Sequence, residues 1–339
     1  MRSFFHKKGV SLSPTAYFIT ALSYMALGLF SSLIIGLIIK TIGEQIQSPT
    51  ISQLLIDMGS MAMGLMGPAI GVAVAYGLNA PPLVIFASIV SGAAGSELGG
   101  PAGAYISALL STELGKLVSK ETKIDILITP FVTIAVGFLS ALFLGTWIDR
   151  FLRGFGSIVM WSTEQRPFIM GILVAVLMGL ALTAPISSAA IAIMLDLSGI
   201  AAGAATIGCA AQMVGFAVSS YRENGFGGLI AQGIGTSMLQ VSNIIKKPII
   251  LIPPTIAGAV LAPFGTIWAN MINNPSGAGM GTSGLVGQIM TFTEMGFSSE
   301  VLFKVLILHI IGPAIISLLL SEWMRKKGWI KFGDMKIDY

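Results

Sequence analysis

The sequence predicts an all-α integral membrane protein with about ten transmembrane helices and two re-entrant glycine-rich hairpins, built from two weakly repeated halves. Of its 339 residues, 54% are hydrophobic and only 10% are charged, whereas soluble domains carry roughly 25% charged residues. A spanning helix needs about 20 apolar residues, so the longest charge-free runs must each hold two crossings. These runs are 9–39, 58–96, 126–148, 167–195, 197–221, 224–245 and 248–293.

The segment NNPSGAGMGTSGLVGQIMTFTE, residues 273–294, is too rich in Gly, Ser, Thr and Asn to form a good helix. Non-helical backbone at membrane depth persists only where protein covers it or where it lines a wet cavity. We therefore predict a re-entrant binding loop for an uncharged polar solute, since hydroxyls and amides both donate and accept hydrogen bonds. The predicted binding residues are Asn273, Asn274, Ser276, Thr282, Ser283 and Gln288.

Part of this segment occurs twice. Residues 233–239 read GIGTSML and residues 279–285 read GMGTSGL, each between long apolar segments. Transporters often contain internal repeats whose broken helices meet at a midplane site, so Thr236 and Ser237 of the first copy join the predicted binding residues. The alternative is that these small residues only allow two helices to pack closely.

Ionisable residues at membrane depth are functional candidates. Glu97 lies in VSGAAGSELGGPAGAY, residues 90–105, an apolar region expected to be irregular. We expect Glu97 to bind a solute hydroxyl or a proton, or else to lie at the water interface of a hairpin. His309 lies in an apolar helix, three residues before Gly312-Pro313. It is expected to bind solute, with Glu294 as a possible partner, or to be a satisfied structural histidine.

Asn224 completes the set of predicted binding residues. It follows Arg222 and Glu223, which we expect to form an exposed turn from which Asn224 reaches the cavity. A proline break at TAPISS, residues 183–188, should end or kink the preceding helix.

The sequence divides into a first membrane half, residues 1–148, an amphipathic interfacial linker helix, residues 149–166, and a second membrane half, residues 167–339, with both Gly-Thr-Ser loops. MGLMGPAIGVAVA, from residue 63, resembles MGLALTAPISSAAIAI, from residue 178, which suggests a duplication. Lysines and arginines near both ends place both termini in the cytoplasm. The charged stretch TELGKLVSKETKID, residues 112–125, is expected to be cytoplasmic as well.

Several functions are excluded by composition. The net charge of +4 comes from residues at the ends of apolar segments, so we expect membrane lipid and no nucleic acid as a partner. Cys209 is the only cysteine, which forbids an intrachain disulfide, and we expect it to be a packing residue. Neither a Ser-His-Asp nor an HExxH grouping appears. We predict no catalytic residue, no metal and no cofactor.

Three motifs resemble a bacterial membrane family, the phosphotransferase-system EIIC-like proteins, which include the perfringolysin-regulator-like proteins. The motifs are TAPISSAAI at 183–191, GFGGLIAQGIGTSM at 225–238 and NNPSGAGMGTSGLVGQ at 273–288. The resemblance implies about ten transmembrane helices with two re-entrant hairpins, a homodimer, and a solute site between a scaffold and a moving part. In sugar-transporting relatives, a glutamate and a histidine at membrane depth help bind the sugar.

The resemblance leaves two functions open. The first is a sugar or sugar-like solute carrier in the bacterial cell membrane that displaces a binding unit across the bilayer. The second is a membrane regulator that senses a ligand without transport and signals through a cytosolic partner. We do not expect an enzyme, because any phosphoryl transfer would use residues on a separate cytosolic phosphotransferase protein.

Overall fold

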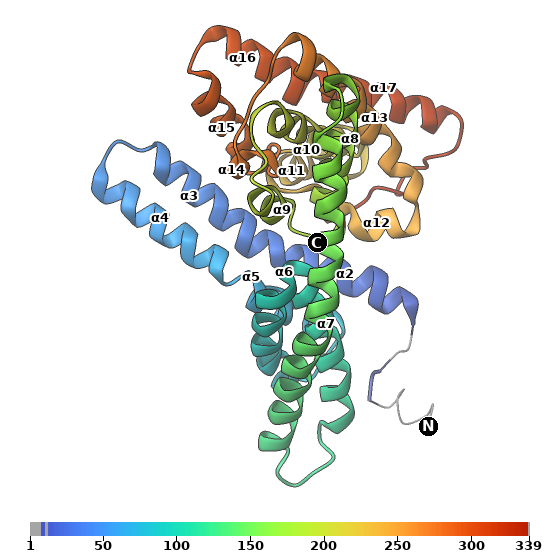
Figure 1. Cartoon of the computed structure of the whole chain (residues 1–339). Helices are drawn as coiled ribbons and strands as arrows, with labels where there is room; N and C mark the ends of the chain where they lie inside the picture. The colour runs from blue at the N-terminus through green and yellow to red at the C-terminus, as the bar shows by residue number, and fades with distance from the viewer. Residues whose placement is uncertain (1–7, 11–12, 338–339) are drawn as a thin grey trace. The chain divides into compact units, whose positions relative to one another are not determined.

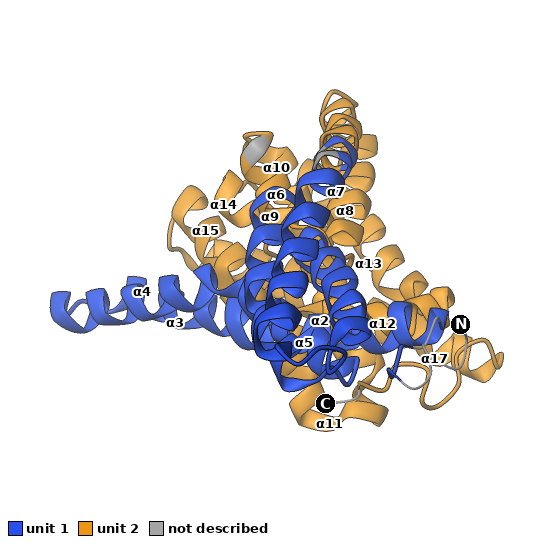
Figure 2. Cartoon of the chain, turned by 90° about the horizontal axis from the view of Figure 1, so that it is seen from below, with its two compact units in different colours: residues 1–151, 339 blue, residues 152–338 orange. Residues whose placement is uncertain are grey.

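The computed structural model describes residues 8–10 and 13–337, and within these ranges it is helical and contains no strand. The all-α prediction is therefore confirmed. The chain divides at Phe151 and Leu152 into two compact units (Figure 2). Unit 1 comprises residues 1–151 and unit 2 comprises residues 152–338.

Unit 1 consists of long helices joined by short turns (Figure 1). The first helical run is continuous from residue 16 to residue 45, and α4 and α5 form a pair bent by 48°. Asn79 adopts a left-handed conformation before two prolines, and Pro82 then begins α6 at the first helical position, where its missing N–H costs nothing. The elements are η1 (Ala16–Ala21), α2 (Leu22–Leu29), η2 (Phe30–Ile34), α3 (Ile35–Gln45), α4 (Pro49–Gly64), α5 (Met66–Gly77), α6 (Pro82–Val118) and α7 (Asp125–Thr163).

The apolar region predicted to be irregular, residues 90–105, is a kinked helix within α6. The kink lies at Gly99 and Gly100, where the φ of Gly100 is +56°. Only glycine adopts such angles readily, and Pro101 removes the next backbone donor. Glu97 lies two residues before Gly99, and its side chain is exposed.

The charged stretch 112–125 is only partly a loop, because α6 continues to Val118. Lys116 is 2% exposed and donates to Glu113 at 2.9 Å and to the carbonyl of Leu78 at 2.9 Å. Lys8 forms a second ion pair, with Glu121, and also donates to the carbonyl of Ser119. The sequence prediction missed the buried ion pair of Lys116 and Glu113.

The segment predicted as a separate interfacial helix, residues 149–166, is mostly the C-terminal part of α7. The helix runs without interruption through the boundary between the two units, and it ends at Thr163. Whether this part lies in a membrane interface stays a prediction.

Unit 2 contains many short helices around one buried helix, α10. Their bounds are α8 (Pro167–Thr183), α9 (Ser188–Met194), α10 (Gly199–Ser219), α11 (Tyr221–Ile230), η3 (Ala231–Gly235), η4 (Ser237–Gln240), α12 (Val241–Lys246), η5 (Pro248–Leu251), α13 (Ile252–Pro263), η6 (Phe264–Trp268), α14 (Pro275–Ala278), η7 (Ser283–Leu285), α15 (Val286–Met295), α16 (Ser299–Val305), η8 (Leu306–Ile311) and α17 (Gly312–Lys326). The predicted break at TAPISS is confirmed, since α8 ends at Thr183 and α9 begins at Ser188.

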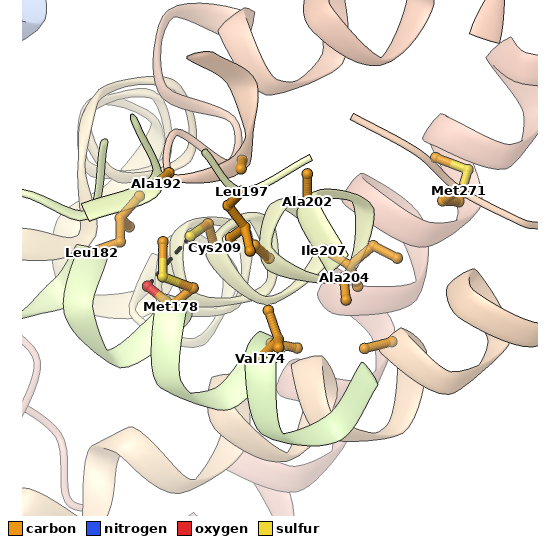
Figure 3. Close-up of a cluster of buried hydrophobic side chains, with 14 of the residues drawn as sticks. Val174, Met178, Leu182, Ala192, Leu197, Ala202, Ala204, Ile207, Cys209 and Met271 are labelled. Carbon is orange, nitrogen blue, oxygen red and sulfur yellow. Dashed lines mark hydrogen bonds between the residues drawn. The ribbon is translucent and has the colours of Figure 1, made fainter. Parts of the chain in front are cut away.

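The core of unit 2 surrounds α10 (Figure 3). Small residues let other backbones approach this helix: a Cβ added at Gly208 would lie 2.0 Å from the carbonyl oxygen of Ala175, and one at Gly203 would lie 2.0 Å from that of Met271. Cys209 is fully buried and points its thiol at the carbonyl of Met178, 3.4 Å away. Its predicted role in packing is confirmed.

Six helices of the described chain are long and apolar enough to cross a membrane, or up to seven if the bent pair α4 and α5 forms one span. The chain is therefore a multi-pass membrane protein by length and composition. The number of about ten crossings and the two re-entrant hairpins stay predictions. The pieces of unit 2 that would supply the additional crossings are broken helices, each too short to span alone.

Candidate functional site

The two Gly-Thr-Ser motifs lie against each other in unit 2. Thr282 Oγ1 donates to the carbonyl of Gly233 at 2.5 Å, and Ser283 Oγ donates to the carbonyl of Gly235 at 2.8 Å. Thr282 and Ser283 are both buried. The hydroxyls of the second copy therefore bond the backbone of the first copy, where π-helical η3 ends.

The proline break TAPISS joins the same cluster from two sides. Thr183 Oγ1 lies 2.8 Å from Ser237 Oγ of the first Gly-Thr-Ser motif. Ser188 Oγ donates to the carbonyl of Gly279 at 2.7 Å, at the start of the second. All three family-like motifs thus meet in one place, and they do so beside α10: a Cβ added at Gly281 would lie 2.6 Å from the backbone of Cys209.

Asn273 fixes the position of the second Gly-Thr-Ser motif relative to α10 and α15. Its backbone pairs with Gly199, at the start of α10, in an isolated antiparallel bridge. Its Nδ2 donates to Thr206 Oγ1 at 2.8 Å, to the carbonyl of Gly287 at 3.0 Å and to Thr291 Oγ1 at 3.1 Å. Because this amide is fully occupied by α10 and α15, Asn273 is a positioning residue for α15.

His309 lies in a π-helical segment, η8 (Leu306–Ile311), directly before Pro313. Proline has no N–H and cannot bond the carbonyl four residues earlier, which is that of His309. The N–H of Gly312 instead reaches the carbonyl of Ile307, a π-type register. Such bulges occur frequently at functional sites. Because Pro313 follows His309 by four residues, the helix widens at the histidine.

Gln288 is the partner of His309. Gln288 Nε2 lies 3.2 Å from His309 Nδ1, and both side chains are buried, with His309 0% exposed. The two remaining polar atoms, Gln288 Oε1 and His309 Nε2, are also buried, and no group of the described chain bonds to them. If Gln288 donates to Nδ1, then His309 Nε2 carries the proton. The pair then presents one acceptor and one donor.

The opposite amide orientation gives the same result. A Gln288 oxygen facing Nδ1 would accept the His309 proton, and the pair would then present an amide donor and an imidazole acceptor. In either arrangement, the pair leaves one donor and one acceptor without a partner in the described part of the chain. Two hydroxyls of one polyol would satisfy the pair, one accepting from the donor and one donating to the acceptor.

Other predicted binding residues lie elsewhere. Glu97 belongs to unit 1, and its side chain and that of Ser276 are exposed. Glu294 accepts from Asn274 Nδ2 at 3.0 Å, so the suggested pairing of Glu294 with His309 is wrong. Asn274 also caps α14 by accepting from Gly277 N. Thr236 caps η4 by accepting from Met238 N.

Asn224 does not belong to this cluster of motifs. Its side chain bonds the backbone of Met335 and Ile337 near the C-terminus. The exposed turn predicted before it is partly wrong: Arg222 is exposed, but these residues lie in α11, and the Glu223 side chain is fully buried against Arg325 at 2.8 Å. A charge in a short polar interval looks exposed in sequence, whereas its partner here comes 102 residues later.

Gln212 is a site residue that the sequence analysis missed. Its Nε2 donates to Thr255 Oγ1 at 2.8 Å, and its Oε1 lies 3.4 Å from Thr183 Oγ1. It is 1% exposed in an otherwise apolar and small-residue helix. A carboxamide buried in such a helix needs partners, and this isolated polarity was the available signal.

One of two comparisons with known proteins identifies a family. The family described as Phosphotransferase system, EIIC matches residues 19–337. A comparison with curated proteins gives no significant match. EIIC proteins are the membrane transport components of phosphotransferase systems, and phosphoryl transfer takes place on other proteins of those systems. The family match covers nearly all of the described chain and all three motifs, so this multi-pass membrane protein belongs to the phosphotransferase system EIIC family.

Proposed function

We propose that the chain carries a sugar or sugar-like solute across the membrane and that Gln288 and His309 bind its hydroxyls. The observation that supports this most directly is the pair of buried polar atoms, Gln288 Oε1 and His309 Nε2, to which the described chain gives no partner. A buried polar group without a hydrogen bond costs about 1–3 kcal/mol. Hydroxyls of a bound sugar would remove that cost by bonding both groups.

The surrounding motifs support the same site. The predicted binding residues Thr282, Ser283 and Ser237 are occupied by contacts between motifs. We propose that their role is to hold the two Gly-Thr-Ser elements together, and that solute reaches Gln288 and His309 when these contacts rearrange. Displacement of the binding unit would then exchange hydrogen bonds between motifs for hydrogen bonds to the solute.

The remaining expectations belong to the same proposal. A carrier of this kind would work as a homodimer in the bacterial cell membrane, surrounded by lipid, with both termini in the cytoplasm and with a separate cytosolic phosphotransferase protein as a partner. The alternative is a regulator that binds the same hydroxylated ligand and signals through that partner without transport.

The first experiment measures ligand binding by the thermal unfolding of the full chain in detergent. A ligand that binds only the folded state raises the unfolding midpoint. We expect one or more neutral sugars to raise it. Gln288→Met removes the amide but keeps the length of the side chain, and it should weaken binding about tenfold, the equivalent of about 1.4 kcal/mol. His309→Phe should have a similar effect.

Gln165→Met is the matched control, since Gln165 lies two residues beyond the end of α7 and its side chain donates to the carbonyl of Trp161. It should bind sugar as the wild type does. A sugar that binds both site variants with wild-type affinity would disprove the assignment of Gln288 and His309. Uptake of the bound sugar into proteoliposomes then separates carrier from regulator, because a regulator binds without uptake.

A further inference from the structure

Three carboxamide side chains bond the backbone of the C-terminal segment, residues 331–337. They come from residues on either side of the first Gly-Thr-Ser motif, residues 233–239. Asn224 bonds the backbone of this segment twice: its Nδ2 donates to the carbonyl of Met335 at 2.8 Å, and its Oδ1 accepts from Ile337 N at 2.9 Å. Gln240 Nε2 donates to the same Met335 carbonyl at 2.9 Å. Asn243 Nδ2 donates to the carbonyl of Lys336 at 2.8 Å.

These contacts extend inward as a chain of buried amides. Asn243 also donates to Gln240 Oε1, Gln240 donates to Gln232 Oε1, and Gln232 donates to Ser220 Oγ, each at 2.8 Å. Met335 packs in a separate hydrophobic cluster with Phe216. The backbone of the segment is therefore fixed to α11, η4 and α12 rather than lying loosely on the surface.

A cavity of about 210 Å³ opens between this segment and the end of α12. Three lysines line it: Lys246 and Lys247 at the end of α12, and Lys336 in the C-terminal segment. Its other lining residues are Asn243, Gly333 and Asp334. The space exceeds what a single water molecule requires.

The cavity carries a net positive charge. In residues 8–10 and 13–337, Lys246, Lys247 and Lys336 form no ion pair. The single carboxylate of the lining, Asp334, accepts from the backbone N of Lys331 at 2.8 Å. Three ammonium groups and one carboxylate leave an excess of two positive charges, which suits a dianion. Lysine is a common partner of phosphate, acting as a point charge.

We propose that this cavity binds the phosphate group of an anionic ligand, either a soluble phosphorylated molecule or the head group of an anionic lipid. Bound phosphate would bridge Lys336 of the C-terminal segment and the two lysines of α12. The site lies outside the Gln288 and His309 pair and uses none of its residues. Because α12 follows the first Gly-Thr-Ser element directly, occupancy of the site should stabilise the attachment of the C-terminal segment to that element.

The test compares two variants of equal net charge in the full chain. The cavity variant carries Lys246→Gln, Lys247→Gln and Lys336→Gln. The control carries Lys326→Gln, Lys327→Gln and Lys331→Gln, three exposed lysines of α17 and the C-terminal segment that do not line the cavity. Both sets are replaced by uncharged side chains of similar length at accessible positions, where substitutions usually change stability by less than about 0.5 kcal/mol.

The measurement is the unfolding midpoint in nanodiscs of phosphatidylcholine, titrated with inorganic phosphate against chloride at matched ionic strength. For a soluble phosphate ligand, phosphate should raise the midpoint of the wild type and control in a saturable way, and the cavity variant should bind about tenfold more weakly or not at all. For a lipid head group, nanodiscs containing phosphatidylglycerol should raise the midpoint of the wild type and control but not of the cavity variant.

Either selective response supports the site and identifies its source. The proposal is overturned if the cavity variant responds like the control in both series, since the response would then come from general screening of positive charge. It is also overturned if no protein responds in either series. Sugar binding at Gln288 and His309 should be the same in both lysine variants, so failure of this site and failure of the sugar site remain distinguishable.

Discussion

Ser283 Oγ donates a hydrogen bond to the carbonyl of Gly235, 48 residues earlier in the chain, and so joins the two copies of the Gly-Thr-Ser motif. The two copies of the motif therefore form a contact that neither copy could form alone. Each copy breaks its helix and frees backbone carbonyls, and the hydroxyls of the second copy satisfy carbonyls of the first. This contact holds the non-helical parts of unit 2 together.

Loss of this contact should destabilise the protein measurably. Ser283→Ala leaves the buried carbonyl of Gly235 without its hydroxyl partner, and Thr282→Val does the same to Gly233. Each change should lower the free energy of unfolding by about 1–3 kcal/mol, measured by thermal or denaturant unfolding in detergent. Ser276→Ala is the control, because Ser276 is exposed, and it should change stability by less than about 0.5 kcal/mol. Equal effects in all three variants would contradict the role of the contact.

Gly281 should not tolerate a side chain. Its φ is +53°, and an added Cβ would lie 2.6 Å from the Cys209 backbone carbon and 2.7 Å from Ala210 N. Gly281→Ala should therefore cost about 2–5 kcal/mol, from left-handed strain and from overpacking. Gly296→Ala separates the two causes, since Gly296 also has a positive φ, +89°, but nothing within 4 Å. It should cost only about 1–2 kcal/mol. An equal loss in both variants would show that strain alone matters.

The sequence predicted the class of the fold and the helix breaks that bring the candidate site together, because both depend on local composition. Apolar runs predict helices, and TAPISS and the Gly-Thr-Ser motifs interrupt them where the structure does. His309 is predicted because a polar side chain is costly in an apolar helix, and Gln288 because it belongs to the polar, glycine-rich loop 273–294. Their pairing, and not the pairing of His309 with Glu294, emerges only from the arrangement of α15 against η8.

Buried partners of charged residues explain most of the remaining errors. Glu223 and Lys116 look exposed in sequence because charged residues surround them, yet each is buried against a partner. For Glu223 that partner is 102 residues away, so no local pattern reveals it. Gln212 was missed for a different reason. No other polar residues surround it in the sequence, and a single amide in a helix of small residues looks like an exception rather than a site.

Asn273 should matter for stability as well as for binding. Asn273→Ala removes bonds to Thr206, Gly287 and Thr291 and should lower the free energy of unfolding by about 2–4 kcal/mol. Because α15 carries Gln288, sugar affinity should fall as well. Asn274→Ala is the control: it removes the cap of α14 and should cost about 1 kcal/mol. An Asn273→Ala protein with wild-type stability would contradict the positioning role.

The buried ion pair of Lys116 and Glu113 in unit 1 provides a test of stability that does not depend on solute binding. Lys116→Met leaves Glu113 and the carbonyl of Leu78 without their ammonium partner. Removal of one partner of a buried ion pair typically costs about 3–5 kcal/mol, whereas replacing both partners is often nearly neutral. We therefore expect Lys116→Met to lower the unfolding midpoint strongly and Glu113→Gln combined with Lys116→Met to recover part of the loss. A double variant no more stable than Lys116→Met would show that the ammonium serves mainly the Leu78 carbonyl.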